Sequence, residues 1–266
     1  MDKLFEEIEQ KNLEEVKKLL ITGTKVDIQN SEGVAPLHHA VKANSPDIVR
    51  LLLEYEADPN QETYKGETAL HFASEVGNVE IVKMLLGFKA DLSVRDNHGH
   101  MAVYHASLRN NPVTLRTLIN AGAGFGDERD KGRKNLHHAV KEGFCEIVRL
   151  MIEAGADGNS QNMDTGETAL HMAVEAKNAD MVQILATAGV DLDIKNRAGK
   201  TALHRASWQG YSEIVQILVD KGANIKEKDN EGTTAIAMAK LREYPAIVKI
   251  LKKGPPKEKK KGWLPW

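Results

Sequence analysis

The stretch Gly66-Glu67-Thr68-Ala69-Leu70-His71-Phe72-Ala73 decides the fold, because similar stretches return along the chain at nearly constant intervals. Its first residue, here called the lead glycine, has counterparts at Gly33, Gly99, Gly132, Gly166, Gly199 and Gly232. All intervals equal that from Gly33 to Gly66, except the one that ends at Gly166, which has one extra residue. A period of this length is typical of a stack of small supersecondary units. The spacing therefore predicts seven full repeats.

Each repeat has the pattern of two short helices. The lead glycine precedes a Thr-Ala-Leu-His motif, whose threonine can cap the helix that it opens. After a polar break such as Gln209-Gly210-Tyr211, aliphatic residues recur at helical spacing in Ile214-Val215-Gln216-Ile217-Leu218-Val219. Gly222-Ala223-Asn224 then ends the second helix. The residues that follow, many of them Asp and Asn, predict an extended β-turn finger before the next lead glycine.

This pattern resembles the ankyrin repeat family over residues 4–252. The resemblance implies an all-α fold, an ankyrin-repeat α-solenoid with β-turn fingers. We expect residues 1–29 to form an N-terminal capping half repeat and residues 30–253 to form the seven repeats. Residues 254–266 make a basic and aromatic C-terminal tail, which we expect to be flexible.

Composition excludes several classes of protein. The 266 residues carry 36 Lys and Arg against 38 Asp and Glu, so the chain lacks the basic excess of a nucleic-acid binder. No apolar run is long enough to cross a bilayer, and the acidic N-terminus does not resemble a secretory signal. The single cysteine, Cys145, cannot form an internal disulfide, which favours a reducing compartment. We expect Cys145 to be a small buried hydrophobic residue.

Five repeats carry a histidine at the same motif position, namely His38, His71, His137, His171 and His204. The resemblance implies that these imidazoles bind backbone groups and tie one repeat to the next. Stacked repeats lie about a helix diameter apart, too far for such histidines to share one metal ion. A metal site built from His98, His100 and His105 is a weaker alternative. Because no catalytic constellation can be assembled, we expect no enzymatic activity, no cofactor and no bound metal.

The resemblance also implies that the fingers and first helices line a concave face that binds another protein. Apart from Arg205, which lies near Trp208 in the sequence, the candidate partner-binding residues flank the lead glycines or precede the break between helices: Tyr64, Glu75, Val76, His98, His100, Leu108, Arg109, Arg133, Lys141, Glu175, Lys200, Arg205, Trp208, Gln209, Leu241 and Arg242.

Trp208 is the strongest candidate, because aromatic residues and arginine are enriched among binding hot spots. Arg197, Lys200 and Arg205 lie near it in sequence, which predicts a basic cluster beside an aromatic anchor. Such a surface suits a peptide with an apolar residue and an acidic neighbour. In the alternative interpretation, Trp208 packs flat over Arg205 or a neighbouring finger.

The third and fourth repeats depart most from the motif. Met101-Ala102-Val103-Tyr104 lacks the capping threonine and the motif histidine, and Lys134-Asn135 replaces Thr-Ala. We expect these changes to soften the centre of the stack, either by drift or as an adaptation to a partner. The one extra residue before Gly166 should lengthen a finger, so that Asp164 projects further.

The sequence thus predicts a non-enzymatic intracellular scaffold or adaptor, monomeric by itself, that binds another protein in the cytoplasm or nucleus. One alternative is a nuclear regulator of a transcription factor, with Lys259, Lys260 and Lys261 as its address. Another is the targeting region of a larger multidomain enzyme. The tail residues Trp263 to Trp266 also suit a membrane-surface anchor, a docking motif or an unstructured extension.

Overall fold

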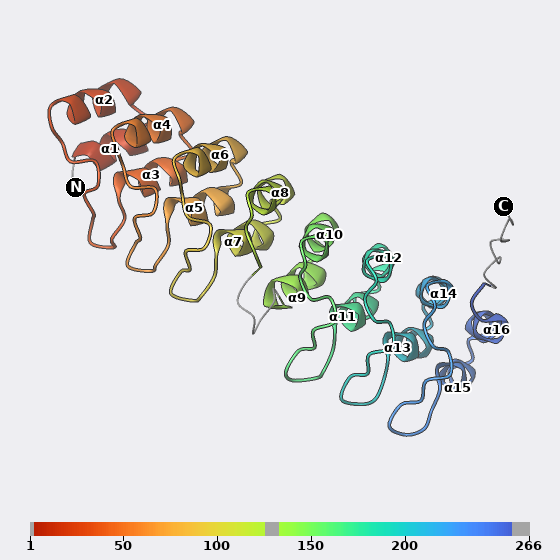
Figure 1. Cartoon of the computed structure of the whole chain (residues 1–266). Helices are drawn as coiled ribbons and strands as arrows, with labels where there is room; N and C mark the ends of the chain where they lie inside the picture. The colour runs from red at the N-terminus through yellow and green to blue at the C-terminus, as the bar shows by residue number, and fades with distance from the viewer. Residues whose placement is uncertain (1–2, 126–132, 257–266) are drawn as a thin grey trace, which may run out of the picture. The chain divides into compact units, whose positions relative to one another are not determined.

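The computed structural model describes residues 3–125 and 133–256. These residues form sixteen helices and no regular β-strand, with one isolated bridge between Lys228 and Thr234. In chain order (Figure 1) the helices are α1 (Lys3–Glu9), α2 (Leu13–Ile21), α3 (Pro36–Lys42), α4 (Pro46–Glu54), α5 (Ala69–Val76), α6 (Val79–Gly87), α7 (Ala102–Leu108), α8 (Pro112–Asn120), α9 (Arg133–Lys141), α10 (Cys145–Glu153), α11 (Ala169–Glu175), α12 (Ala179–Thr187), α13 (Ala202–Gln209), α14 (Ser212–Asp220), α15 (Ala235–Leu241) and α16 (Pro245–Lys253). The all-α repeat fold predicted from the sequence is confirmed.

The chain divides into two compact units. Unit 1 comprises Met1–Asn135 with Glu153–Ala156, and unit 2 comprises Leu136–Ile152 with Asp157–Trp266. The division falls inside α9, in the fourth repeat, where the sequence motif is least regular. None of the helices described in either unit has the length and apolar character needed to cross a bilayer.

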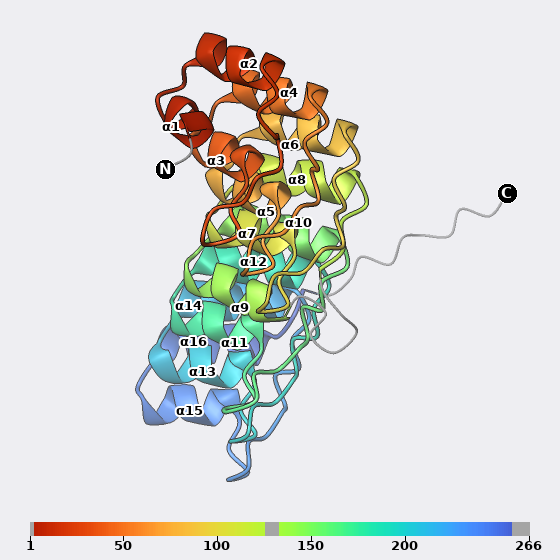
Figure 2. The ribbon, with the colours of Figure 1, turned by 90° about the vertical axis from the view of Figure 1, so that its left-hand side faces the viewer.

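Within each unit the helices form two rows. In unit 1, the odd-numbered helices α1, α3, α5 and α7 pack in sequence against one another, and the even-numbered helices α2, α4, α6 and α8 do the same. In unit 2, α11, α13 and α15 form one row and α12, α14 and α16 the other. We call the odd-numbered row, from which the fingers extend, the inner row, and the other the outer row (Figures 1 and 2).

The core of each unit is a layer of aliphatic side chains between the two rows. The leucine of the motif is almost fully buried in every regular repeat, as at Leu70, Leu170 and Leu203. The outer helices contribute residues such as Ile81 and Leu85, which are completely buried. Because every repeat buries the same set of residues, the core extends along each unit and needs few large aromatic side chains.

The N-terminal half repeat is built on the same plan. Helix α1 packs against α2 and α3, and its Leu4 and Ile8 are completely buried. The Asn12 side chain caps α2 by accepting a hydrogen bond from the Glu15 backbone N–H at 3.4 Å. This cap satisfies one of the free N–H groups at the start of the helix.

The motif histidines link successive repeats, as the family resemblance implies. The Nδ1 atom of His71 accepts a hydrogen bond from the Thr68 backbone N–H at 3.0 Å, which places the ring proton on Nε2. Nε2 then donates to the carbonyl oxygen of His100 in the next repeat at 3.1 Å. Nε2 of His38 likewise bonds to a backbone carbonyl oxygen, that of Gln61 in the finger before Gly66, at 2.9 Å. Burial lowers the pKa of both imidazoles to about 4, so they are neutral near pH 7.

Several lead glycines, among them Gly33, are required by the close approach of neighbouring fingers. The backbone N–H of Tyr64 donates to the carbonyl oxygen of Glu32 in the preceding finger at 3.1 Å. Gly33, beside this bond, has a φ of +74°, and a Cβ atom there would lie 2.6 Å from Cδ1 of Tyr64. Both the backbone conformation and the space therefore exclude a side chain at this position.

Cys145 differs from expectation. It begins α10, at the place in the repeat that the sequence indicates, but its side chain is half-buried and not buried.

Candidate partner-binding surface

We use the term inner-row surface for the solvent-accessible side chains of the odd-numbered helices and the fingers, taken separately in each unit. Among the large apolar residues of the described chain, Tyr64 is 68% exposed, Leu241 is 72% exposed and Trp208 is 40% exposed. Val76 is also exposed, whereas Leu108 is half-buried. Most of the apolar candidates identified from sequence are thus accessible to a partner.

The charged and polar candidates vary in exposure. His98, Arg109, Lys141, Glu175, Gln209 and Arg242 are exposed. Glu75, His100, Arg133, Lys200 and Arg205 are half-buried. The tail candidates Lys259, Lys260, Lys261, Trp263 and Trp266 lie outside the described residues.

In unit 1, the residue nine positions after a lead glycine reaches the inner helix of the next repeat. The ammonium group of Lys42 lies 4.0 Å from the centre of the Phe72 ring, in a cation–π contact. Glu75 occupies the same position one repeat later and accepts a hydrogen bond from Nε of Arg109 at 3.0 Å. The sequence showed these residues to be surface candidates but did not show that they pair with one another.

Unit 2 follows the same rule. Glu175 lies nine positions after its lead glycine, and its carboxylate is 3.3 Å from Nη1 of Arg205 in the next inner helix. Trp208 lies at the equivalent position one repeat later, and the guanidinium carbon of Arg242 is 4.8 Å from its ring centre. The side chains of this row therefore contact the following repeat, which holds them in defined orientations.

The structure corrects the prediction of a basic cluster beside Trp208. Arg205 binds two carboxylates, those of Glu167 and Glu175, and its side chain is only 21% exposed. Arg197 is also engaged, because its guanidinium group donates to the carbonyl oxygen of Met163. The three residues of the Arg205 group carry a net negative charge. Arg205 therefore contributes to the structure of unit 2 and not to a free basic cluster.

The aromatic anchor itself is stacked with Arg242 from the next repeat. Trp208 does not pack over Arg205, whose guanidinium group the two glutamates hold. Lys200 is half-buried at the turn before α13. Hence the cation over the tryptophan ring is Arg242, at the C-cap of α15, and not one of the nearby residues Arg197, Lys200 and Arg205 that the sequence indicated.

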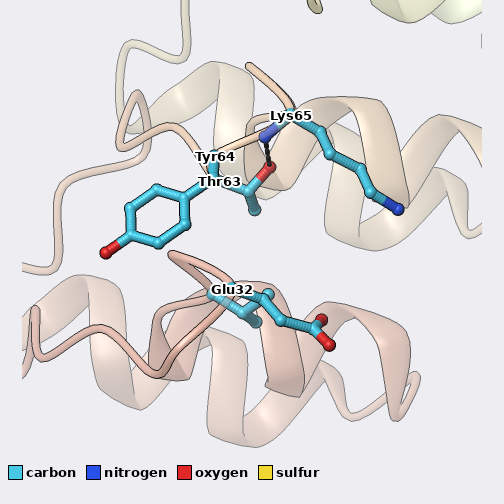
Figure 3. A pocket seen from close by; sticks show the side chains of 5 residues that line it. Glu32, Thr63, Tyr64 and Lys65 are labelled. Carbon is cyan, nitrogen blue, oxygen red and sulfur yellow. Dashed lines mark hydrogen bonds between the residues drawn. The ribbon is translucent and has the colours of Figure 1, made fainter.

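A second accessible feature lies between two fingers of unit 1. A shallow pocket of about 280 Å³ is lined by Glu32, Val34, Thr63, Tyr64 and Lys65. In Figure 3 the Tyr64 ring points to one side, while the Glu32 carboxylate and the Lys65 ammonium group point to the other. Thr63 stabilises this arrangement because its hydroxyl oxygen accepts the Lys65 backbone N–H at 3.2 Å. The pocket offers both signs of charge and one aromatic ring to a ligand.

The histidines of the third repeat support their finger. Asp96 is buried, and one of its oxygens accepts the backbone N–H groups of His98 and His100, each at 2.9 Å. Its other oxygen lies 3.2 Å from Nε2 of His105. The ring of His100 stacks on that of Tyr104, with 3.7 Å between the ring centres. Burial lowers the pKa of His100. Within the described residues, no set of three His, Cys, Asp or Glu side chains is arranged to hold a metal ion.

The extra residue before Gly166 is accommodated at a fingertip. In the regular finger before Gly199, the glycine N–H bonds to Asn196 three residues earlier, at 2.8 Å. In the longer finger, the Gly166 N–H bonds to Asn162 four residues earlier, at 3.2 Å. Met163 and Asp164 are exposed at this tip, as the sequence predicts for Asp164.

Comparison with known proteins identifies the family. The family model for ankyrin repeats, which comprises three copies of the repeat, matches three times, over residues 4–96, 88–162 and 158–229. Among solved structures, the chain is similar to the ankyrin repeat domain of Bcl-3, a unique member of the IkappaB protein family. The two chains are 28% identical with a TM-score of 0.50, over 94% of this chain and 97% of the other. No curated protein sequence gives a significant match.

These matches agree with the repeat period, the paired helices and the histidine bridges. Ankyrin repeats generally mediate the binding of one protein to another. The family model alone spans more than half of the sequence. The chain belongs to the ankyrin repeat family.

Proposed function

We propose that this protein is a non-enzymatic intracellular scaffold or adaptor that binds a partner protein on its inner-row surface. The observation that supports the proposal best is the exposed ring of Trp208, which fills no core and is held by a cation from the next repeat. A rigid aromatic side chain loses little conformational entropy on binding, and such residues dominate many interfaces.

The net charge and the use of the titratable side chains support the same proposal. A formal net charge of -2 does not favour direct binding to nucleic acid. The described clusters of titratable side chains are used in bridges between repeats or fingers, which suits a binding surface more than a catalytic site. We propose that the protein acts as a monomer in the cytoplasm or the nucleus.

The proposal is tested by affinity purification from a cell lysate with three forms of the full chain: wild type, Trp208→Ala and Ile21→Ala. Ile21 is a suitable control because it is 65% exposed but belongs to an outer helix of unit 1. We expect the same partner with wild type and Ile21→Ala, and at least a tenfold loss with Trp208→Ala. Equal capture by all three forms would place the contact elsewhere.

The lysine run Lys259-Lys260-Lys261 favours a second candidate function, a nuclear regulator that holds a transcription factor. A fluorescent fusion of the chain should then accumulate in the nucleus and become cytosolic when the three lysines are changed to alanine. A distribution that does not change on this replacement contradicts the nuclear proposal and leaves the scaffold proposal intact.

A further inference from the structure

We propose that Arg242 is the specificity-determining residue of the inner-row surface in unit 2, and that it selects a partner segment with a carboxylate beside an apolar side chain. This inference rests on the proposed function, because it names the chemistry of the partner at the same surface. It also assigns different roles to Arg109 and Arg242, which lie at the same position in their repeats.

Arg205 is already satisfied within the protein. Its guanidinium group binds the carboxylates of Glu167 and Glu175, and the side chains of Arg205 and Glu167 are 21% and 17% exposed. Glu175 is 58% exposed and could be displaced by a partner carboxylate, but Glu167 would still occupy the guanidinium group, and displacing Glu167 would strip a largely buried carboxylate of its cation. Such a displacement is unfavourable because it leaves a charge without its partner.

Arg242 has no such carboxylate. Within the described part of the chain, its side chain makes no hydrogen bond or ion pair, and its contact is with the face of the Trp208 ring. A cation–π contact with the ring uses none of the guanidinium N–H donors in a hydrogen bond, so they remain available to a partner. Those donors match the two oxygens of a carboxylate, and the ring beneath restricts the orientation in which they are presented.

The apolar part of the partner is accommodated by the two residues that flank this cation. Leu241 occupies the same position in its repeat as Trp208 does in the preceding one, and is 72% exposed. The two side chains therefore belong to adjacent inner helices, α13 and α15, which pack against each other. An aliphatic or aromatic residue of the partner can cover them while the neighbouring carboxylate reaches the edge of Arg242.

Charge complementarity favours this direction. Helix α15 and its C-cap present Lys240 and Arg242, followed by one exposed acid, Glu243. The carboxylates of Glu167 and Glu175, in the repeat that precedes that of Trp208, are bound to Arg205. The exposed acids Glu231 and Glu243 balance the two cations of α15 and its C-cap in formal charge, so the guanidinium group of Arg242, on the ring itself, is the local cation that an opposite charge on the partner would meet.

A matched control exists in unit 1. Arg109 lies ten positions after its lead glycine, as Arg242 does, but it pairs with Glu75 where Arg242 stacks on Trp208. If position in the repeat alone determined the role, both arginines would contribute equally to partner selection. If the available N–H donors determine it, only Arg242 will.

The test uses a phage-displayed library of random dodecapeptides, selected on the immobilised full chain. We expect wild type to enrich peptides with Asp or Glu next to Leu, Ile or Phe. Arg242→Glu should invert the preference to Lys or Arg, whereas Arg109→Glu should leave the wild-type preference unchanged. For one selected acidic peptide, a fluorescence titration should show affinity reduced about tenfold or more in Arg242→Glu and in Trp208→Ala, the second of which measures dependence on the ring. Thermal melting of each variant verifies that it is folded.

The outcomes separate the two proposals. Peptides that depend on Trp208 but retain the same acidic preference with Arg242→Glu would overturn the role of Arg242 and leave the proposed function standing. Loss of the acidic preference with Arg109→Glu would overturn it as well. If no enriched peptide depends on Trp208, both the specificity inference and this binding surface are wrong.

Discussion

The guanidinium group of Arg242 lies 4.8 Å from the centre of the Trp208 ring, although the two residues belong to consecutive repeats. Glu75 reaches Arg109 at the same place in the next repeat. Lys42 and Glu175 instead reach Phe72 and Arg205, which lie one helical turn earlier. In these four repeats, the ninth residue after the lead glycine contacts one of two positions in the next inner helix or its C-cap. Pairs between repeats therefore satisfy part of the surface of each unit.

Replacing Trp208 should affect binding far more than folding. We expect Trp208→Ala to lower the free energy of unfolding by about 1 kcal/mol or less, since it removes an exposed cation–π contact. Leu203→Ala, in the same helix, should cost about 2–5 kcal/mol because its side chain is buried. Urea denaturation of both variants measures the difference. A loss for Trp208→Ala as large as that for Leu203→Ala would show that the tryptophan is a packing residue.

Stability should fall as the pH decreases from about 6.5 towards 4. The pKa of His38 and His71 is about 4 in the folded protein and 6.5 for an ordinary histidine, because burial disfavours the charged ring. Between these values the unfolded chain binds more protons than the folded chain, so protons favour unfolding. The contribution of these two histidines to the free energy of unfolding is complete above pH 6.5. By pH 5 the free energy of unfolding should have fallen by up to about 2 kcal/mol for each of them.

Urea midpoints between pH 7 and pH 5 test this dependence before most carboxylates titrate. His38→Gln should make the slope shallower, while His98→Gln, which replaces an exposed histidine, should leave it unchanged. A wild-type slope of zero across this range would contradict the neutral state of the bridging imidazoles.

A lead glycine that lies close to the neighbouring finger, such as Gly199, should be less tolerant of replacement than Gly189, which follows an outer helix. A Cβ atom at Gly199 would overlap the Asn230 side chain and lie 2.6 Å from its backbone nitrogen. Gly189 also has a positive φ, but no atom lies within 4 Å of a Cβ atom built there. Gly189→Ala should therefore cost about 1–2 kcal/mol of backbone strain, and Gly199→Ala clearly more. Thermal melting of the two variants decides whether the close approach of the fingers matters.

The two arginine–glutamate contacts of the inner row should differ in their contribution to stability. Arg205→Ala leaves Glu167, which is 17% exposed, without its cation, and we expect a loss of about 1–3 kcal/mol. Arg109→Ala breaks a contact whose partners are 58% and 35% exposed, and the expected loss is about 0–1 kcal/mol. Chemical denaturation at low and high salt distinguishes them, because salt screens only the exposed pair strongly. Equal losses would mean that Arg205 is not a structural residue.

The amino-acid sequence by itself was sufficient to predict the repeat fold and the roles of its motif residues. The constant period establishes which residues are equivalent, and a residue type that recurs at one position, such as Leu70 or His71, acts in the same way in each regular repeat. These roles depend on local structure and on contacts with an adjacent repeat of nearly the same sequence. The repeat pattern is therefore enough to predict them. The exposure of Tyr64, Trp208 and Leu241 follows for the same reason.

Only the tertiary structure decided which surface charges are satisfied and which remain available. Arg205 and Arg242 both lie near Trp208, and the sequence favoured Arg205 because it is in the same helix. The outcome depends on which side chains of the adjacent repeat come within reach: Arg205 meets Glu167 and Glu175, and Arg242 meets the tryptophan ring. Such contacts are made by variable side chains across two repeats, and a periodic pattern determines where these side chains start but not where their ends meet.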